Sequence, residues 1–338
     1  MILYPIEFRF PWMNALAPRG EWLLGASLRS RNTVLDMALY NVGDLTDAEI
    51  ETLTRATNRE GRVLIVYPSG WKSEDGIVLL DDHAAVRDRP GPLLEHFCIA
   101  GVGSSDLGAA ALARDVANAV RAPVGAIVAG YGMMDVVTEG LGGWTYLRAR
   151  NRLLDLVDDD LDDRAKRRDD APDTADEASG GPHADGDAGD DTGDDTGDTS
   201  LVDTAWATPD VETLRRFFLD ADRDIKMVVG HSKGCLSIAD AMVRLARDPD
   251  PAVHDRIGRV RIITTGAVVR FPSVCANVTQ YLGELDILGA CNSRGNLPRV
   301  LVPNANHHLN TWVPYHLSMA QVLRHAETGG THWVAETP

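Results

Sequence analysis

Cysteine is scarce in this sequence, and long apolar runs are missing from it. The 338 residues include 4 cysteines, Cys98, Cys235, Cys275 and Cys291, which form no CxxC pair and are too sparse for a disulfide scaffold. No segment reaches the roughly 18 consecutive apolar residues that a membrane-spanning helix needs. These absences predict a protein of a reducing compartment that has no transmembrane segment.

The N-terminal residues also lack the pattern of a signal peptide. Residues 15–17 read A-L-A and are similar to a cleavage site, but Pro5, Glu7 and Arg9 interrupt the apolar stretch that must precede such a site. We therefore expect a cytoplasmic protein.

Basic side chains are too few to balance the acidic ones. The chain has 33 Lys and Arg against 50 Asp and Glu, for a net charge of -17. Residues 155–203 alone hold 19 acidic and 4 basic side chains, so the other 289 residues carry 31 acidic and 29 basic groups. Because no basic surplus is left to attract phosphates, the sequence argues against nucleic acid and anionic membranes as partners.

The acidic stretch is interpreted as a linker. Residues 157–204 repeat Asp, Gly and Thr with almost no apolar side chain, a composition that predicts a disordered segment. Asp185, Asp187 and Asp190 offer oxygen ligands for calcium, but their spacing departs from the D-x-D-x-D-G pattern and no Glu closes the loop. A solvated linker without a metal ion is therefore the preferred interpretation.

The whole chain has 44% hydrophobic and 25% charged residues, a composition that predicts a globular protein. We expect one α/β domain formed by residues 62–156 and 205–338, with residues 1–61 as an N-terminal helical segment packed on its core. The acidic linker, residues 157–204, separates the two parts.

Short apolar runs alternate with helical patterns along the predicted domain. Thr46 and Glu49 form a capping box that opens a helix through Arg55. The first two apolar runs are expected to pair as an antiparallel hairpin, and the later alternation predicts a mainly parallel central sheet covered by helices on both faces. The predicted strands are 62–67, 76–80, 96–100, 124–129, 225–229, 259–264, 278–282 and 299–302, and the other predicted helices are 107–120, 211–219 and 235–246.

Residues 230–234 carry the strongest chemical signal. They read G-H-S-K-G and lie directly between the predicted strand 225–229 and the predicted helix 235–246. A sharp turn there would expose the Ser232 hydroxyl above the edge of the sheet, and the helix N-terminus would favour negative charge developing beside it. An ordinary glycine-rich turn from strand to helix is the alternative interpretation.

A serine hydroxyl becomes a good nucleophile when a base takes its proton and a carboxylate orients that base. Asp286 follows the predicted strand 278–282, and His307 and His308 follow the last predicted strand. The sequence therefore places an acid and a base after the serine, each at the end of a strand.

With this motif and this order of residues, the sequence resembles the α/β-hydrolase fold superfamily, and within it bacterial serine esterases or lipases with a GHSKG nucleophile elbow. The resemblance covers about residues 62–326. It implies Ser232 as the nucleophile, Asp286 as the acid and His307 as the base, with His308 as the alternate base. Glu284 is expected to be a solvent-facing neighbour of the acid.

The resemblance also implies an activity and an oxyanion hole. The expected reaction is cleavage of a small-molecule or lipid ester through an acyl-enzyme, without a cofactor. The backbone N–H of Lys233 would be one oxyanion donor, and Val102 or Gly103 would supply the second. A dinucleotide site in this loop is disfavoured, because Asp106 and Gly130 stand where that motif needs a glycine and an acidic residue.

Residues 144–157 form an amphipathic helical pattern after glycines at 140, 142 and 143. Since insertions at the strand ends of this fold overhang the active site, they are interpreted as a lid-like helix over an apolar acyl pocket. A surface helix packed on the sheet is the alternative.

Other histidines and another class of function were weighed. His231 is expected to point away from Ser232 and to pack or form a hydrogen bond. A metal site of Asp286, His307, His308 and His316 is disfavoured, because zinc sites usually show tighter spacing. The rival function is a non-catalytic scaffold that binds a small ligand or a partner protein, and the sequence indicates no oligomeric state. Surface or helix-capping positions are expected for His83, His96, His254, His325 and His332.

Overall fold

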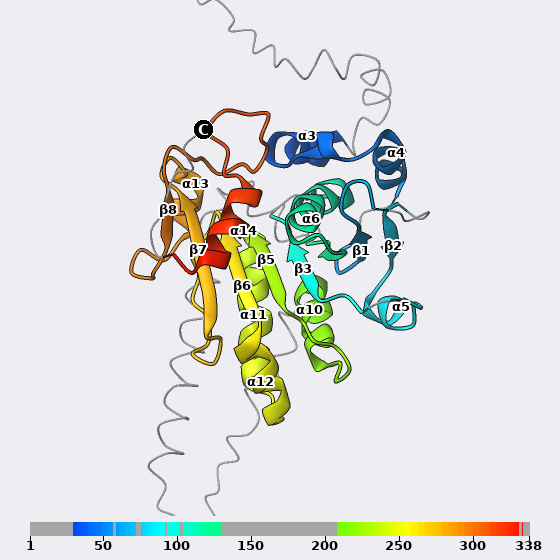
Figure 1. Cartoon of the computed structure of the whole chain (residues 1–338), viewed down its shortest axis with the longest axis vertical. Helices are drawn as coiled ribbons and strands as arrows, with labels where there is room; N and C mark the ends of the chain where they lie inside the picture. Colours follow the sequence, from blue (N-terminus) through cyan, green and yellow to red (C-terminus); the bar gives the residue numbers. More distant parts are fainter. Residues whose placement is uncertain are drawn as a thin grey trace, which may run out of the picture.

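In the computed structural model, residues 30–56, 59–71, 76–91, 93–101, 104–129, 208–330 and 333 are described. They build an eight-stranded sheet with the strand order β2-β1-β4-β3-β5-β6-β7-β8 (Figure 1). The strands are β1 (Val63–Val66), β2 (Val78–Leu80), β3 (His96–Ile99), β4 (Val124–Ile127), β5 (Met227–His231), β6 (Arg261–Thr265), β7 (Asn277–Gly283) and β8 (Val300–Val302).

The sheet is mainly parallel, as the sequence predicts. Strands β4, β3, β5, β6, β7 and β8 run in one direction, and β1 runs antiparallel to both of its neighbours. Val63 pairs with Leu80, which confirms the expected opening hairpin. Every residue of β1, β4 and β5 is buried, and this burial on both faces explains their continuous apolar runs.

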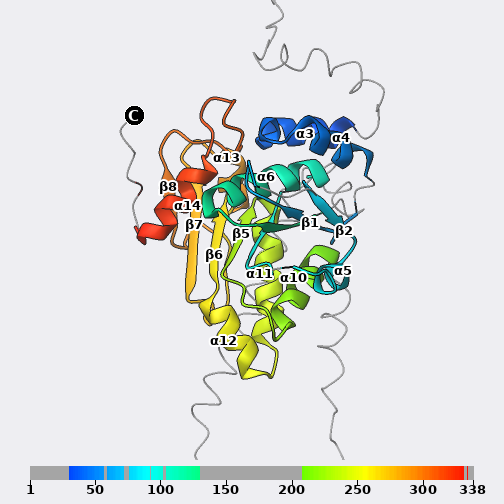
Figure 2. The same cartoon turned by 45° about the vertical axis from the view of Figure 1, so that its right-hand side comes forward.

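Helices cover both faces of the sheet, and the fold is therefore of the α/β class (Figures 1 and 2). One face packs against α6 (Asp106–Val120) and α14 (Met319–Thr328), and the other packs against α10 (Pro209–Leu219), α11 (Lys233–Ala246) and α12 (Pro251–Arg259). Two short helices, α5 (His83–Arg87) and α13 (Ile287–Asn292), follow β2 and β7.

The described N-terminal part packs on α6. It contains α3 (Ser30–Leu39), the short η1 (Val42–Asp44) and α4 (Asp47–Arg55). The capping box is confirmed, because Thr46 Oγ1 accepts a hydrogen bond from the Glu49 N–H and Glu49 Oε2 accepts one from the Thr46 N–H at 2.8 Å. Glu49 also forms a buried ion pair with Arg114 of α6, which fastens α4 to the domain.

Several expectations fall on residues outside the described ranges. The predicted linker 157–204, the predicted lid-like helix 144–157 and the first 29 residues are among them. The division into domain parts therefore stays a prediction.

The predictions about disulfide bonds and transmembrane segments can be compared with the described residues. Among the described residues, Cys98, Cys235, Cys275 and Cys291 form no disulfide bond, and the first three are buried. Within the described ranges, no helix has the length and apolarity needed to span a bilayer.

Candidate active site

Ser232 lies in the sharp turn between β5 and α11. Its backbone has φ 53° and ψ -119°, a conformation that a residue with a side chain adopts at a cost of about 1–3 kcal/mol. The Ser232 N–H donates a hydrogen bond to the Thr265 carbonyl at 2.9 Å, which fixes the turn against the end of β6. Gly234 is required for the turn, because a Cβ there would collide with the Ile99 carbonyl oxygen of β3.

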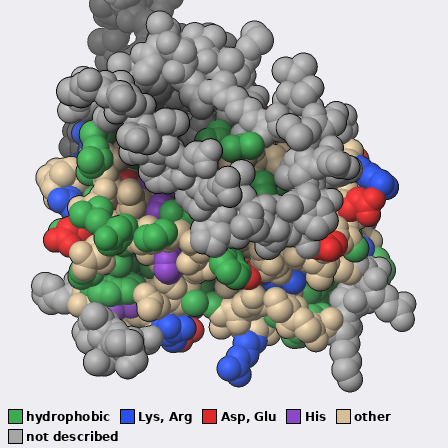
Figure 3. All heavy atoms as spheres, turned by 90° about the horizontal axis from the view of Figure 1, so that it is seen from above, with side chains coloured by type: hydrophobic (Ala, Val, Ile, Leu, Met, Phe, Trp, Pro, Cys, Tyr) green, Lys and Arg blue, Asp and Glu red, His purple; other side chains and the backbone are tan. Residues whose placement is uncertain are grey.

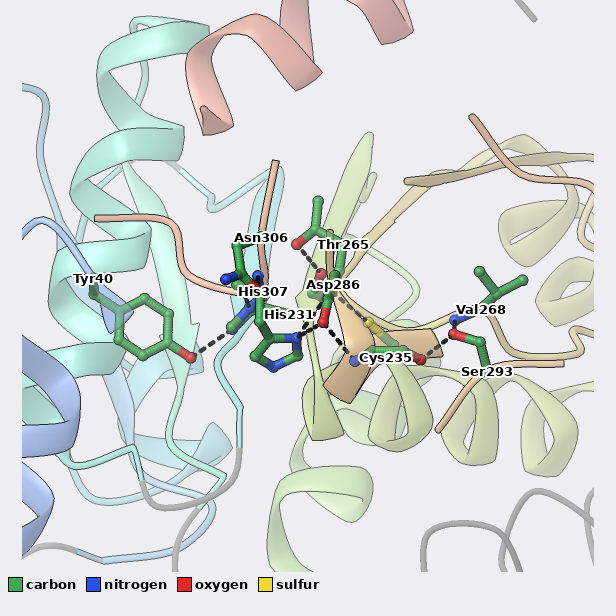
Figure 4. Close-up of polar contacts among 11 residues, drawn as sticks. Tyr40, His231, Cys235, Thr265, Val268, Asp286, Ser293, Asn306 and His307 are labelled. Atoms are coloured by element: carbon green, nitrogen blue, oxygen red, sulfur yellow. Dashed lines mark hydrogen bonds and ion pairs between the residues drawn. The ribbon is translucent and has the colours of Figure 1, made fainter. Parts of the chain in front are cut away.

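Asp286 and His307 form a buried pair beside this turn. Both oxygens of the Asp286 carboxyl group lie near His307 Nδ1, at 2.9 and 3.0 Å (Figure 4). Asp286 is the N-cap of α13, where its Oδ1 also accepts a hydrogen bond from the Gly289 N–H at 2.6 Å. Because a carboxylate only accepts hydrogen bonds, His307 carries its proton on Nδ1, and its Nε2 is left to act as a base.

The structure separates His307 from His308. In the described part of the chain, His307 and not His308 contacts Asp286. The side chain of His308 is half-buried. Its pKa is lowered, mainly by this burial and to a smaller extent by the nearby His316. Glu284 is exposed and accepts a hydrogen bond from the Asn304 N–H, which agrees with its expected solvent-facing position.

Ser232 and His307 both lie beside the end of β6. Ser232 is bonded there through Thr265, and Gly266 follows with φ 71°. A Cβ on Gly266 would lie 3.0 Å from His307 Cε1, so only glycine lets the imidazole pack this closely. The rings of His307 and His231, the neighbour of Ser232, have centroids 4.9 Å apart. The parallel strands β5, β7 and β8 thus end at the same edge of the sheet, where Ser232, Asp286 and His307 follow them.

The predicted oxyanion donors are placed in part. Lys233 is the first residue of α11, where backbone N–H groups point toward the N-terminal end of the helix and favour negative charge. Its side chain is buried, and its Nζ lies 3.5 Å from the Ala129 carbonyl oxygen. Val102 and Gly103 lie outside the described residues, between Gly101 and the N-terminus of α6.

His231 is buried completely and forms hydrogen bonds through both ring nitrogens. Its Nδ1 lies 2.8 Å from the Tyr40 hydroxyl, and its Nε2 lies 3.0 Å from the His307 carbonyl oxygen. Burial first, and then the nearby His307, lowers the pKa of His231 to about 3. His231 is therefore neutral at physiological pH, and its expected packing and hydrogen-bonding position agrees with the structure.

Asp36 is a buried carboxyl group of this region that the sequence analysis missed. It lies on α3 and accepts hydrogen bonds from the Ser105 N–H and from the hydroxyls of Ser104 and Ser105. Burial raises its pKa to about 7, against the lowering effect of these hydrogen bonds. Asp36 therefore joins α3 to the loop that follows β3.

The stability of the protein is expected to depend on the protonation of Asp36. Its pKa is raised from 3.8 to about 7, so between these values the folded protein holds a proton that the unfolded chain has released. As pH rises from about 5 to about 8, the loss of this proton should lower the free energy of unfolding by about 3 kcal/mol. Urea denaturation should show a flatter pH dependence for Asp36→Asn.

The wild-type protein is the internal control for this measurement. Burial also raises the pKa of Asp115 to about 8, and this contribution is common to both proteins. Equal pH dependence in the wild type and in Asp36→Asn would contradict a proton on Asp36 in the folded state.

Apolar side chains lie exposed around the acid and the base. Leu285, Ile287 and Leu288 flank Asp286, and Trp312 and Tyr315 belong to the segment after His307. Figure 3 views the molecule from the end where α3 and α13 lie, and it shows hydrophobic side chains gathered near histidines there.

In the described ranges, no group of three or more His, Cys, Asp or Glu side chains is arranged to hold a metal ion. Comparisons with protein families, with curated proteins and with solved structures found no match for this chain. Its function is therefore inferred from the chemistry of the site.

Proposed function

We propose that this protein is a serine hydrolase with an α/β-hydrolase fold that cleaves carboxylic esters through an acyl-enzyme. The observation that carries the proposal is the buried hydrogen bond between Asp286 and His307 Nδ1, at the strained turn that presents Ser232. The mainly parallel sheet, with the turn at the end of β5, supports the fold assignment.

Each residue has a role in the first half of the reaction. His307 Nε2 takes the proton of Ser232 Oγ while Oγ bonds to the ester carbonyl carbon, and the carbonyl electrons move onto its oxygen. Asp286 holds the imidazole in the required tautomer and stabilises the imidazolium. The Lys233 N–H stabilises the oxyanion. The carbon–oxygen bond to the alcohol then breaks, and His307 gives its proton to the leaving oxygen.

The second half of the reaction regenerates the enzyme. A water molecule gives a proton to His307 Nε2 as its oxygen bonds to the acyl carbon. The bond to Ser232 Oγ breaks, Oγ takes the proton back and the carboxylic acid leaves. The exposed apolar side chains beside Asp286 favour a small-molecule or lipid ester with an apolar acyl group.

A fluorophosphonate probe tests this proposal directly. Intact-protein mass spectrometry should show one adduct on the wild-type protein, because such probes react with serines that a neighbouring base activates. The adduct should be absent from the Ser232→Ala protein. A panel of p-nitrophenyl esters graded by chain length would then define the acyl group.

The matched control is Ser237→Ala, since Ser237 is buried in α11 away from the turn and should not change labelling. A folded wild-type protein that forms no adduct would overturn the proposal. It would favour a non-catalytic scaffold that binds a small ligand or a partner protein.

A further inference from the structure

A chain of hydrogen bonds joins three loops around Ser232. The Gly101 N–H, at the end of β3, donates to the Tyr40 hydroxyl at 2.7 Å. That hydroxyl lies 2.8 Å from His231 Nδ1, and His231 Nε2 lies 3.0 Å from the His307 carbonyl oxygen. In Figure 4, Tyr40 approaches this pair of histidines from the side opposite Asp286. Both Tyr40 and His231 are fully buried.

The direction of each hydrogen bond in this chain is determined. The Gly101 N–H can only donate, and the His307 carbonyl oxygen can only accept. His231 Nε2 must therefore carry a proton, and because the ring is neutral, Nδ1 must accept. Tyr40 accepts from Gly101 and donates its own proton to His231. Burial raises the pKa of the Tyr40 hydroxyl, which keeps that proton in place.

The backbone next to Tyr40 is fastened to the segment that follows His307. The Leu39 carbonyl accepts a hydrogen bond from the Leu309 N–H at 2.7 Å, and the Met37 carbonyl accepts one from Asn310 Nδ2 at 2.6 Å. These hydrogen bonds hold the backbone beside Tyr40 in place, so its hydroxyl can orient His231.

We propose that Tyr40 is a positioning residue for the hydrolase reaction. Its hydroxyl holds neutral His231 in the tautomer with a proton on Nε2, and His231 in turn holds the backbone of His307. The same hydroxyl holds Gly101, which lies beside the nucleophile: a Cβ on Gly101 would be 3.0 Å from Ser232 Cβ. This inference rests on the proposed function of Ser232 and His307.

Loss of the hydroxyl would release both partners inside a buried site. The Gly101 N–H and His231 Nδ1 would lack their hydrogen bonds, and His231 could rotate or change its tautomer. The imidazole of His307 would then be held less accurately above Ser232. A displacement of about 1 Å in such a site lowers the rate by about 100-fold, although substrate binding changes little.

Tyr40→Phe tests the role of the hydroxyl, and Tyr281→Phe is its matched control. Tyr281 is also fully buried, and its hydroxyl also contacts a histidine nitrogen, Nδ1 of His325, at 2.9 Å. The contact joins β7 to α14 and does not involve Ser232 or His307. With p-nitrophenyl acetate, Tyr40→Phe should lower kcat by about 10- to 100-fold with little change in KM. Tyr281→Phe should lower the melting temperature without this loss of kcat.

A double variant tests whether Tyr40 acts through His231. In a His231→Phe background, Tyr40→Phe should cost less kcat than in the wild type, because one of the two groups that its hydroxyl holds is already gone. Losses that multiply independently would overturn the action through His231, and a Tyr40→Phe protein with wild-type kcat would overturn the whole inference. The rate of fluorophosphonate labelling distinguishes the two proposals. A wild-type protein that is not labelled overturns both. Equal labelling rates for the wild type and Tyr40→Phe overturn the positioning role alone.

Discussion

His307→Ala is expected to lower kcat/KM for p-nitrophenyl acetate by about 10⁴-fold or more. His307 is the histidine that Asp286 orients, so its removal leaves the Ser232 hydroxyl without a base. Steady-state kinetics on the purified protein measures the loss. Far-UV circular dichroism checks that the fold persists.

His308→Ala is the matched control for this change. His308 is the adjacent residue and has the same type of side chain. Its backbone carbonyl accepts a hydrogen bond from the Leu317 N–H, and the substitution leaves this bond in place. Most of the wild-type activity should remain. If His308→Ala removed activity and His307→Ala did not, the base would be His308 and the assigned pair would be wrong.

Asp286→Asn should lower kcat by about 10⁴-fold. The amide N–H can donate a hydrogen bond to His307 Nδ1, and this favours the tautomer in which Nε2 is protonated and cannot act as a base. The fold should survive, because asparagine is as good an N-cap as aspartate for α13. A loss of activity at an unchanged melting temperature is therefore the expected result.

Glu284→Gln is the control for the carboxylate. Glu284 is also an acidic residue of this turn, but it is exposed and bonds to the Asn304 N–H, which a glutamine side-chain oxygen can still accept. Its kcat should stay close to that of the wild type. An Asp286→Asn protein with wild-type kcat would show that another group orients the base.

The strands and the turn at Ser232 were predictable because their signals are local. Buried parallel strands appear as continuous apolar runs, and residues 230–234 lie directly between such a run and a helix. Which of His307 and His308 contacts Asp286 depends instead on contacts between distant segments. The segment after them is fixed by carbonyl groups of α3, such as that of Leu39, and no periodicity in the sequence reports this.

Other elements were missed although some carried local signals. Helix α12 begins with Asp250 as its N-cap and Pro251 in the first turn, and α14 begins with Ser318 as its N-cap. Helices α5 and α13 were missed as well. Helix α3 lies in the predicted N-terminal helical segment, but neither its bounds nor the contacts of Tyr40 and Asp36 were predicted.

The prediction of a surface or helix-capping position is wrong for His83, and for His325 it did not foresee the buried partner. His83 is buried, and its Nε2 lies 2.8 Å from Asp220 Oδ2 across 137 positions of the chain. His325 bonds to Tyr281 and stacks on Trp333. Pairings between distant segments leave no pattern that a single sequence can show.

The contact between α3 and the segment after His307 also sets an order of events during synthesis. Asn41 Oδ1 accepts a hydrogen bond from the Thr311 N–H, a residue made 270 positions later. At about 5–20 residues per second, a ribosome needs roughly 15 to 50 s to cover that distance. If the protein is the hydrolase proposed above, nascent chains that already contain Ser232 should lack its activity until the segment after His307 emerges and docks on α3.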